Sequence, residues 1–343
     1  MNNGLRVAFF GRGDLGLSVL KRLLLTEQIS VCLIITCDPS PDVPLSRDLF
    51  REVAAKHDIM YLESNDINSP QVCKLISDLS IDLAVAMLWL YKIKARVIDS
   101  IKHGILNLHG GLLPRYRGNA CQAWAILSGE RELGVTCHLM KPSELDSGPV
   151  IRQKSFLIRE DAKVGDLISE VSRIGADLVI DSVMQFVNGD FKSIPQNDSL
   201  SLECYPRLPR DGEINWCMDS KSILRLIRAA GAPYSGAYSF YRGKLDGLLH
   251  KLVVVDARIE NYPKGDYLAV PGHIIRFTIT NECAVVCGDK RLIVLERIEI
   301  DGEEVLAIEA IRSVRQRLGL DISSEINSLW KLMAKSSKKL SDC

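Results

Sequence analysis

The sequence has neither a net charge nor a long apolar run. Lys and Arg together number 43, and so do Asp and Glu, which gives a formal net charge of zero. Without an overall positive field, a partner with a long phosphate backbone is disfavoured. No segment is apolar over the roughly 20 residues that a membrane helix needs. We therefore expect neither a membrane protein nor a general nucleic-acid binder.

The ten cysteines form no pattern that is typical of metal or redox sites. No C-x-x-C pair occurs, and Cys283 and Cys287 have no second pair or histidine cluster to complete a zinc site. Most cysteines lie in hydrophobic runs, which indicates buried free thiols in a reducing compartment. The first four residues lead directly into a strand-like run without an apolar signal core. We expect a cytoplasmic protein without a bound metal.

The first half of the 343-residue chain alternates between continuous apolar strand candidates and helical patterns. This alternation predicts an α/β domain with a Rossmann-like parallel sheet that is covered on both faces. The expected strands span residues 5–10, 29–36, 83–88 and 105–109, and the expected helices span residues 15–25, 48–57, 70–79, 95–102 and 163–187.

The pattern changes near residue 195 to one helix and then short β-like runs with turn residues between them. Such runs are typical of a small antiparallel barrel, here of an OB-like type. The helix is expected at 220–229 and the runs at 236–241, 251–256, 273–279, 284–287 and 292–299. We expect a catalytic domain over residues 1–200, an OB-like domain over 201–318 and a partly disordered tail over 319–343.

A glycine-rich turn follows the first expected strand. Gly11-Arg12-Gly13-Asp14-Leu15-Gly16 matches G-x-G-x-x-G, and Asp38 stands where an acid would bind the ribose of a dinucleotide. Glycines at a strand-to-helix turn also permit tight geometry without binding phosphate. An NAD-dependent oxidoreductase is therefore one hypothesis, and it predicts measurable NADH binding.

A second motif lies at the end of the strand expected over 105–109. Asn107 and His109 are two residues apart, so their side chains project from one face while Leu108 packs on the other. The carboxyl edge of an open α/β sheet is where such folds hold ligands. An amide can stabilise a developing oxyanion, and an imidazole can accept a proton from an attacking amine. The pair therefore suits acyl transfer to an amine, although an isolated Asn-x-His more often caps a loop.

Four short segments between residues 107 and 148 carry a family resemblance. They read Asn-Leu-His-Gly from Asn107, Leu-Leu-Pro-x-Tyr-Arg-Gly from Leu112, Gly-Val-Thr-x-His-x-Met from Gly134, and Asp-x-Gly from Asp146. Together they resemble the folate-dependent formyltransferases, which include methionyl-tRNA, glycinamide-ribonucleotide and amino-sugar enzymes. The resemblance places the family's catalytic trio on Asn107, His109 and Asp146.

The resemblance implies transfer of a formyl group from 10-formyltetrahydrofolate to a primary amine, without a metal. Asp146 would hydrogen-bond to His109 and raise its pKa. His109 and Asn107 would polarise the formyl oxygen while the amine attacks, and His109 would carry the proton. No covalent enzyme intermediate is needed, and we expect no cysteine to be placed to form one.

The resemblance also assigns a pocket for the folate donor. The pterin is expected against the loop 88–93, bound largely by backbone groups, with the loop 142–146 closing the pocket. The sequence departs from the aminoarabinose-type enzymes at Asn119, where they carry Arg, and the loop before Asp146 is one residue longer. The expected donor contacts are Tyr91, Lys92, Ile93, Gly111, Leu112, Leu113, Pro114, Asn119 and Leu145.

Residues 207–216, 225–229 and 233–237 resemble the linker and the start of the C-terminal domain in the tRNA and aminoarabinose enzymes. Arg210 and Trp216 are candidate acceptor contacts there. A surface salt bridge for Arg210 and a core position for Trp216 are their alternatives.

The segment after the second expected strand bears on the choice between tRNA and a small molecule as the acceptor. In the tRNA enzyme a basic loop is expected there, but residues 37–46 contain two acids and neither Lys nor Arg. A loop that reads phosphates without cations is implausible. The expected acceptor is therefore a nucleotide-linked amino sugar of the kind used in bacterial surface polysaccharides such as lipopolysaccharide O-antigen. Methionyl-tRNA is the alternative, a non-catalytic protein on the same fold stays open, and a homodimer is compatible with the sequence.

Overall fold

The computed structural model describes residues 4–40, 43, 45–142, 144–242, 248–262, 266–277 and 279–319, together with residues 323, 325–327, 329–331 and 333. The chain divides into two compact units, Met1–Arg207 and Leu208–Cys343. Most of the tail that was expected to be partly disordered lies outside the described residues, so that expectation stays a prediction. None of the described helices combines the length and the apolarity that crossing a bilayer requires.

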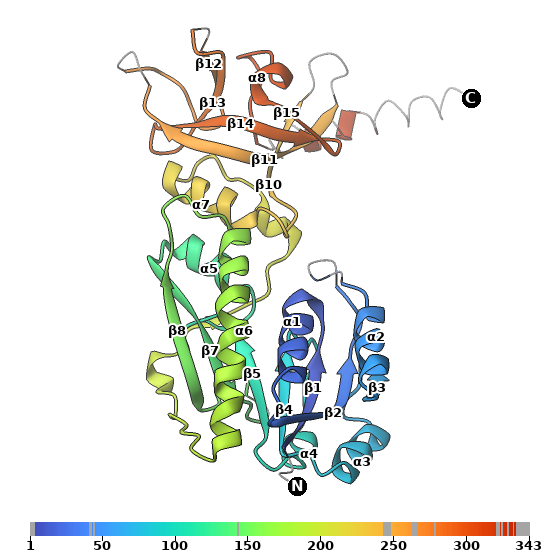
Figure 1. The fold of residues 1–343 in the computed structure, drawn as a ribbon. Coiled ribbons are helices and arrows are strands. Elements are labelled where there is room, and N and C mark those ends of the chain that lie inside the picture. Colours follow the sequence, from blue (N-terminus) through green and yellow to red (C-terminus); the bar gives the residue numbers. More distant parts are fainter. Residues whose placement is uncertain are drawn as a thin grey trace, which may run out of the picture. The chain divides into compact units, whose positions relative to one another are not determined.

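The first unit contains a seven-stranded sheet (Figure 1). Its strand order is β3-β2-β1-β4-β5-β7-β8, and the five strands from β3 to β5 are parallel, which confirms the predicted parallel sheet. The strands are β1 (Leu5–Gly11), β2 (Ile29–Thr36), β3 (Met60–Glu63), β4 (Leu83–Met87), β5 (Ile105–His109), β7 (Glu132–Leu139) and β8 (Val150–Leu157).

β7 and the edge strand β8 run antiparallel to their neighbours and were not predicted. Most β8 side chains are exposed, so this strand lacks the continuous apolar run by which the parallel strands were identified. Two further short strands, β6 (Arg117–Gly118) and β9 (Glu203–Cys204), pair in parallel away from the main sheet.

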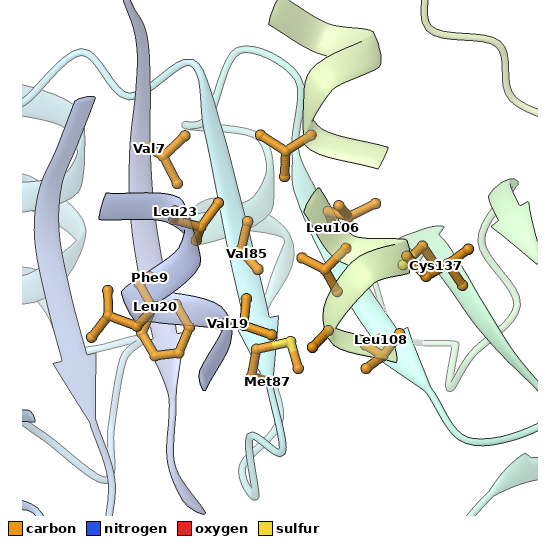
Figure 2. Packing of buried hydrophobic residues seen from close by; sticks show 14 of the residues in the cluster. Val7, Phe9, Val19, Leu20, Leu23, Val85, Met87, Leu106, Leu108 and Cys137 are labelled. Carbon is orange, nitrogen blue, oxygen red and sulfur yellow. The ribbon is translucent and has the colours of Figure 1, made fainter. Parts of the chain in front are cut away.

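Helices cover both faces of the sheet. The core of one face is built by α1 (Gly13–Leu24), α2 (Asp48–Lys56) and α6 (Val164–Asn188), and that of the other by α3 (Pro70–Asp78) and α4 (Ala95–Ile98). Figure 2 shows α1 side chains beside alternate residues of β1 and β4, while Leu106 and Leu108 of β5 lie beside α6. Asn107 and His109 therefore project from the opposite face of β5.

Local capping explains several helix ends. Ser69 caps α3 by accepting from the Val72 N–H, and Gly189 ends α6 at φ 71°. The helix expected over 95–102 ends already at Ile98. There the Ser100 hydroxyl donates to the Val97 carbonyl at 2.7 Å, and this bond competes with the backbone hydrogen bond that a further helical turn would need. A helix that was not predicted, α5 (Cys121–Ser128), follows β6.

The second unit is a curled antiparallel sheet with strand order β10-β11-β14-β13-β12 and β15 beside β14, which confirms the predicted β-rich C-terminal domain. Its long helix α7 (Ser220–Ala230) packs against β11. The strands are β10 (Ala237–Arg242), β11 (Leu249–Glu260), β12 (Ile274–Phe277), β13 (Glu282–Val286), β14 (Leu292–Ile300) and β15 (Glu303–Leu306), and a short α8 (Ala307–Ala310) follows.

Candidate active site

The end of β5 brings Asn107 beside a histidine that was not among the predicted site residues. In the β5–β7 ladder Asn107 pairs with His138 and His109 pairs with Thr136. Asn107 Nδ2 donates to His138 Nε2 at 3.1 Å, and His138 Nδ1 donates to the Leu139 carbonyl at 3.1 Å. His138 is 1% exposed. The signal in the sequence for His138 was its position in the Thr-x-His-x-Met segment, one of the four that carry the family resemblance.

Asp146 lies between the two histidines. Its Oδ2 is 3.4 Å from His109 Nδ1, and its Oδ1 is 3.3 Å from His138 Nε2. The Gly118 N–H donates to Oδ2 at 2.9 Å, and the Gln196 amide donates to the Asp146 carbonyl at 2.8 Å. The structure thus brings Asn107, His109 and Asp146 together, with His138 as a fourth member.

The charge state of Asp146 follows from this environment. Burial raises the pKa of the carboxyl group, but His109, His138 and the Gly118 N–H outweigh burial and lower the pKa to about 2. Asp146 is therefore ionised at neutral pH and supplies a fixed negative charge to the site.

His109 behaves differently from expectation. Burial lowers its pKa, and this effect outweighs Asp146 and the Tyr116 carbonyl, which both raise the pKa. The expected net rise in the pKa is therefore wrong, because the loss of solvation of the imidazolium exceeds its stabilisation by Asp146. Nε2 donates to the Tyr116 carbonyl at 2.5 Å. The neutral ring then presents Nδ1 to Asp146, where an added proton would be balanced by the carboxylate.

Cys121 lies closer to this histidine than the sequence suggested. Its Sγ donates to the Tyr116 carbonyl at 3.1 Å and is 3.6 Å from His109 Nε2. The expectation that no cysteine forms a covalent intermediate stays a prediction. A hydrogen bond with Cys204 and burial raise the pKa of the Cys121 thiol, so Cys121 stays protonated and is a poor nucleophile.

The loop after β5 is fixed by polar side chains of β7 and β8. Thr136 Oγ1 donates to the Gly111 carbonyl at 2.6 Å and accepts from the Leu113 N–H at 3.3 Å. Gln153 donates to Thr136 Oγ1 at 2.7 Å and to the Leu113 carbonyl at 3.0 Å. A Cβ on Gly111 would lie 2.8 Å from His109 Nε2, so only glycine fits there. Gln153 was not predicted because β8 was not.

The loop expected to hold the pterin follows β4. Tyr91 and Lys92 are exposed, whereas Ile93 is buried in the sheet core. Asn68 accepts from the Lys94 N–H at 2.7 Å and donates to the Lys92 carbonyl at 2.8 Å. Trp89 Nε1 is buried and has no hydrogen-bond partner among the described residues. Of the other expected donor contacts, Gly111 and Leu113 are buried, Leu112 and Pro114 are half-buried, and Asn119 and Leu145 are exposed.

Arg12, within the glycine turn, reaches this loop. Its side chain is 5% exposed, its Nε donates to the Leu88 carbonyl at 2.8 Å, and its Nη1 donates to Ser40 Oγ at 2.6 Å. Leu88 has a φ of 53°, so the loop starts in the left-handed region. A Cβ on Gly11 would lie 2.8 Å from the Met87 carbonyl. The turn thus serves the close packing of β1 against β4.

The carboxylate of Asp38, expected to bind a ribose, accepts from Arg47 at 2.7 Å and from Asn65. The surrounding segment 37–46 is described except for residues 41, 42 and 44. In the described part of the chain, no group of three or more His, Cys, Asp or Glu side chains is arranged to hold a metal ion.

The two candidate acceptor contacts lie in the second unit. Trp216 is 4% exposed, packs in the core of that unit and donates to Ser239 Oγ at 2.9 Å. Its ring is therefore not available to stack on a ligand, and the core alternative is correct for Trp216. Arg210 is exposed on a 3-10 turn, Pro209–Gly212, and its role stays a prediction.

The sequence matches the family model described as formyl transferase over residues 5–183 and the one described as formyl transferase, C-terminal domain, over residues 208–315. A methionyl-tRNA formyltransferase from Chloroflexus aurantiacus is 29% identical over 298 residues, which cover 85% of this chain and 91% of that protein.

Solved structures show the same fold. The N-formyltransferase from Helicobacter canadensis, in complex with folinic acid and dTDP-3-aminofucose, matches with a TM-score of 0.59 at 17% identity, over 84% of this chain and 98% of that one. HypX from Aquifex aeolicus, in complex with tetrahydrofolic acid, matches with a TM-score of 0.56 at 19% identity, over 90% of this chain and 47% of HypX.

Proposed function

Because this chain belongs to the formyl transferase family, we propose that it transfers the formyl group of 10-formyltetrahydrofolate to the amine of a nucleotide-linked amino sugar. Membership makes the chain an enzyme that uses a tetrahydrofolate-derived formyl donor, and it replaces the hypothesis of an NAD-dependent oxidoreductase. The observation that carries the proposed chemistry is the convergence of Asn107, His109 and Asp146 at the end of β5.

Asn107 and His109 activate the formyl carbonyl in this proposal. An amide carries two N–H donors, so Asn107 can keep its bond to His138 and offer the second N–H to the formyl oxygen. His109 Nε2 donates to the Tyr116 carbonyl in this structure. Polarisation of the formyl oxygen by His109 therefore requires donor binding to replace that contact.

His109 and Asp146 also transfer the proton from the substrate amine to the folate nitrogen in this proposal. The substrate amine attacks the formyl carbon, the bond from that carbon to the folate nitrogen breaks, and the amine proton must move to the released nitrogen. A neutral His109 can accept this proton, directly or through water, and the Asp146 carboxylate, 3.4 Å from Nδ1, balances the new charge. The ring then returns the proton to tetrahydrofolate.

The donor pocket is proposed at the carboxyl ends of β4 and β5, beside the point where the strand order reverses between β1 and β4. The unsatisfied Trp89 Nε1 supports this location, because a polar atom of a bound molecule would satisfy the buried N–H. Tyr91, Lys92 and Ile93 on the same loop, together with Gly111 and its neighbours after β5, remain the proposed donor contacts.

The choice of acceptor rests on charge. The segment 37–46, which would have to read tRNA phosphates, contributes no cation, and the chain has no net positive charge. A small anionic acceptor needs only one or two cations. We place the reaction in the cytoplasm, which agrees with the free thiols of Cys32, Cys37, Cys73, Cys121, Cys137, Cys204, Cys217, Cys283 and Cys287.

Methionyl-tRNA is the second candidate acceptor. It is favoured by the relatives at 29% identity, which are methionyl-tRNA formyltransferases and are covered over 91% of their length. The two candidates differ in product, so one experiment separates them.

The test is incubation of the pure protein and 10-formyltetrahydrofolate with a panel of nucleotide amino sugars, and in parallel with charged initiator tRNA. The proposal expects one sugar to gain the mass of a formyl group while the tRNA stays unchanged. Formylated tRNA with untouched sugars would establish the second candidate instead.

The proposed catalytic roles have a separate test. We predict that His109→Ala and Asp146→Ala fold but lose nearly all transfer, measured as initial rate, because each removes part of the proton path. Arg173→Ala, which removes a largely exposed side chain of α6, serves as the control and should keep the wild-type rate. Undiminished turnover by either site variant would remove the mechanism.

A further inference from the structure

Just before the first unit ends, the chain passes beside residues 117–119, of which Gly118 contacts Asp146. Residues 202–207, here called the strap, run beside the turn that follows β5. The Arg117 N–H donates to the Leu202 carbonyl at 2.8 Å, and the Asn119 N–H donates to the Cys204 carbonyl at 2.9 Å. Gly118, which donates its N–H to Asp146, pairs with Cys204 in the β6–β9 ladder.

The end of the strap holds an aromatic ring in solvent. Trp124 Nε1, on α5, donates to the Tyr205 carbonyl at 2.8 Å, and the Arg207 guanidinium lies 5.5 Å from the centre of the Trp124 ring. These contacts fix the backbone at Tyr205 but leave its side chain outside, at 73% exposure. An exposed ring on a fixed backbone can stack on a ligand with little loss of conformational freedom, and the neighbouring residue Cys204 pairs with Gly118, which is bonded to Asp146.

We propose that Trp124, Tyr205 and Arg207, here called the linker shelf, bind the nucleoside diphosphate part of the acceptor. Tyr205 stacks on the base, and Arg207, whose guanidinium lies over the Trp124 ring, contacts the diphosphate. This inference rests on the proposed function, because it names the subsite that holds the nucleotide while the sugar amine reaches His109.

The spacing agrees with such a ligand. Paired strands lie about 5 Å apart and neighbouring Cα atoms 3.8 Å apart, so the Tyr205 backbone is within roughly 9 Å of Gly118. Gly118 is hydrogen-bonded to Asp146. A sugar whose amine lies at the catalytic residues therefore places its diphosphate along the strap and its base near Tyr205.

The chemistry of the linker shelf agrees as well. An aromatic face stacks on any base, and a guanidinium offers paired donors to phosphate oxygens. Arg115, also exposed on the turn beside the strap, adds a second cation, although Arg115 Nη2 donates to Glu130 at 3.0 Å. Since Arg207 and Arg115 belong to the first unit, the subsite needs no residue of the second.

The test uses the full-length protein, saturating donor and varied nucleotide amino sugar. Tyr205→Ala is expected to raise the acceptor KM about tenfold, as loss of one stacked base does, with kcat and donor KM within twofold of wild type. Arg207→Ala should raise the acceptor KM similarly. Tyr205→Phe keeps the ring and should behave as wild type. The control Arg51→Ala removes an exposed arginine of α2 that bonds to Glu63 of the edge strand β3.

Direct binding keeps this inference separate from the proposed function. The nucleoside diphosphate without its sugar should bind wild type and Tyr205→Phe equally in calorimetry, and Tyr205→Ala about tenfold more weakly. This holds even if the formylated sugar is missing from the panel. An unchanged acceptor KM or unchanged nucleotide affinity in Tyr205→Ala would overturn the linker shelf. So would a wild type that binds no nucleotide and formylates only tRNA.

Discussion

At the scale of single residues, Asp146 is the group on which the site depends. Its two carboxylate oxygens have different neighbours. Oδ1 lies next to His138, while Oδ2 lies next to His109 and accepts a hydrogen bond from the Gly118 N–H. Asp146 itself sits at φ 49°, a left-handed conformation that is costly for this residue type unless neighbours hold it. Two hydrogen bonds hold this conformation: the Gly118 N–H donates to the carboxylate, and the Gln196 amide donates to the Asp146 carbonyl.

This arrangement predicts how stability depends on pH. The pKa of Asp146 is lowered to about 2, below an unfolded value of about 3.9, so ionised Asp146 stabilises the fold at neutral pH by about 2 kcal/mol. That stabilisation is present above pH ~4 and is lost as the pH falls towards 2. We therefore expect Asp146→Asn to be less stable than wild type at pH 7, and the difference to shrink below pH ~4.

Denaturant unfolding of wild type and Asp146→Asn at several pH values measures this difference. Asp161→Asn, which removes a carboxylate with a 76% exposed side chain, should change stability little at any pH. A gap between wild type and Asp146→Asn that stays constant from pH 7 to pH 3 would show that Asp146 does not stabilise the fold through its charge.

A second residue, Arg12, links the glycine turn to the proposed donor loop. Its guanidinium holds the Leu88 carbonyl and Ser40, both from outside the turn. Arg12→Met removes both of these charged hydrogen bonds, so we expect a stability loss of at least about 1.5–3 kcal/mol and a severalfold rise in donor KM at nearly constant acceptor KM. Arg12→Lys should fall between the two, because one ammonium cannot reach both partners as a guanidinium does.

Donor and acceptor titrations of each variant provide the measurement. Arg22→Met, on the exposed side of α1, is the matched control and should leave both KM values unchanged. An unaltered donor KM in Arg12→Met would mean that the turn has no part in the donor site.

At the scale of secondary structure, the sequence predicted the elements that are buried on both sides. The strands β1, β2, β4 and β5 are continuous apolar runs, and the structure has them within one residue of the predicted bounds. The strands β7 and β8 were missed. β8 is largely exposed on the sheet edge, whereas β7 is buried but carries Thr136 and His138 within its run, so its apolar pattern is interrupted.

The site residues on predicted strands could be derived from the sequence, and those on β7 and β8 could not. Asn107 and His109 lie on a predicted strand, so their shared face followed from its period of two. His138 and Gln153 lie on β7 and β8, where no strand had been assigned, so their approach to the site could not be derived. The balance between burial and Asp146 in setting the pKa of His109 depends on three-dimensional packing and is invisible in a sequence.

The β7–β8 connection offers a prediction of its own. A Cβ on Gly148 would lie 1.6 Å from the Leu139 carbonyl, a backbone atom that cannot move aside. Gly148→Ala must therefore shift the connection and with it Asp146, and we expect a loss of about 3 kcal/mol or more together with a large loss of kcat.

The control for this substitution is Gly189→Ala at the end of α6. Gly189 has a φ of 71° and open space around its Cβ position, so alanine there should cost only about 1 kcal/mol and leave kcat unchanged. Equal stability losses in the two variants would show that the Leu139 contact relaxes without consequence.

At the scale of the whole molecule, net charge is the property that bears on the proposed acceptor. The chain has a net charge of zero and two units with separate cores, and the second unit belongs to a domain type that also occurs in tRNA-modifying relatives. A domain of this kind does not by itself specify nucleic acid. What tRNA binding requires is a set of cations along a phosphate backbone, and the expected loop at 37–46 supplies none.

This reasoning gives the last prediction. In transfer to a nucleotide amino sugar, uncharged bulk tRNA at micromolar concentration should not inhibit the wild-type enzyme, and the rate should change less than twofold between 50 and 200 mM salt. A protein that neutralises several phosphates would lose orders of magnitude in affinity over that range. The free nucleoside diphosphate is the positive control and should compete with the sugar. Strong inhibition by tRNA that disappears on adding salt would contradict the charge argument and favour methionyl-tRNA as the acceptor.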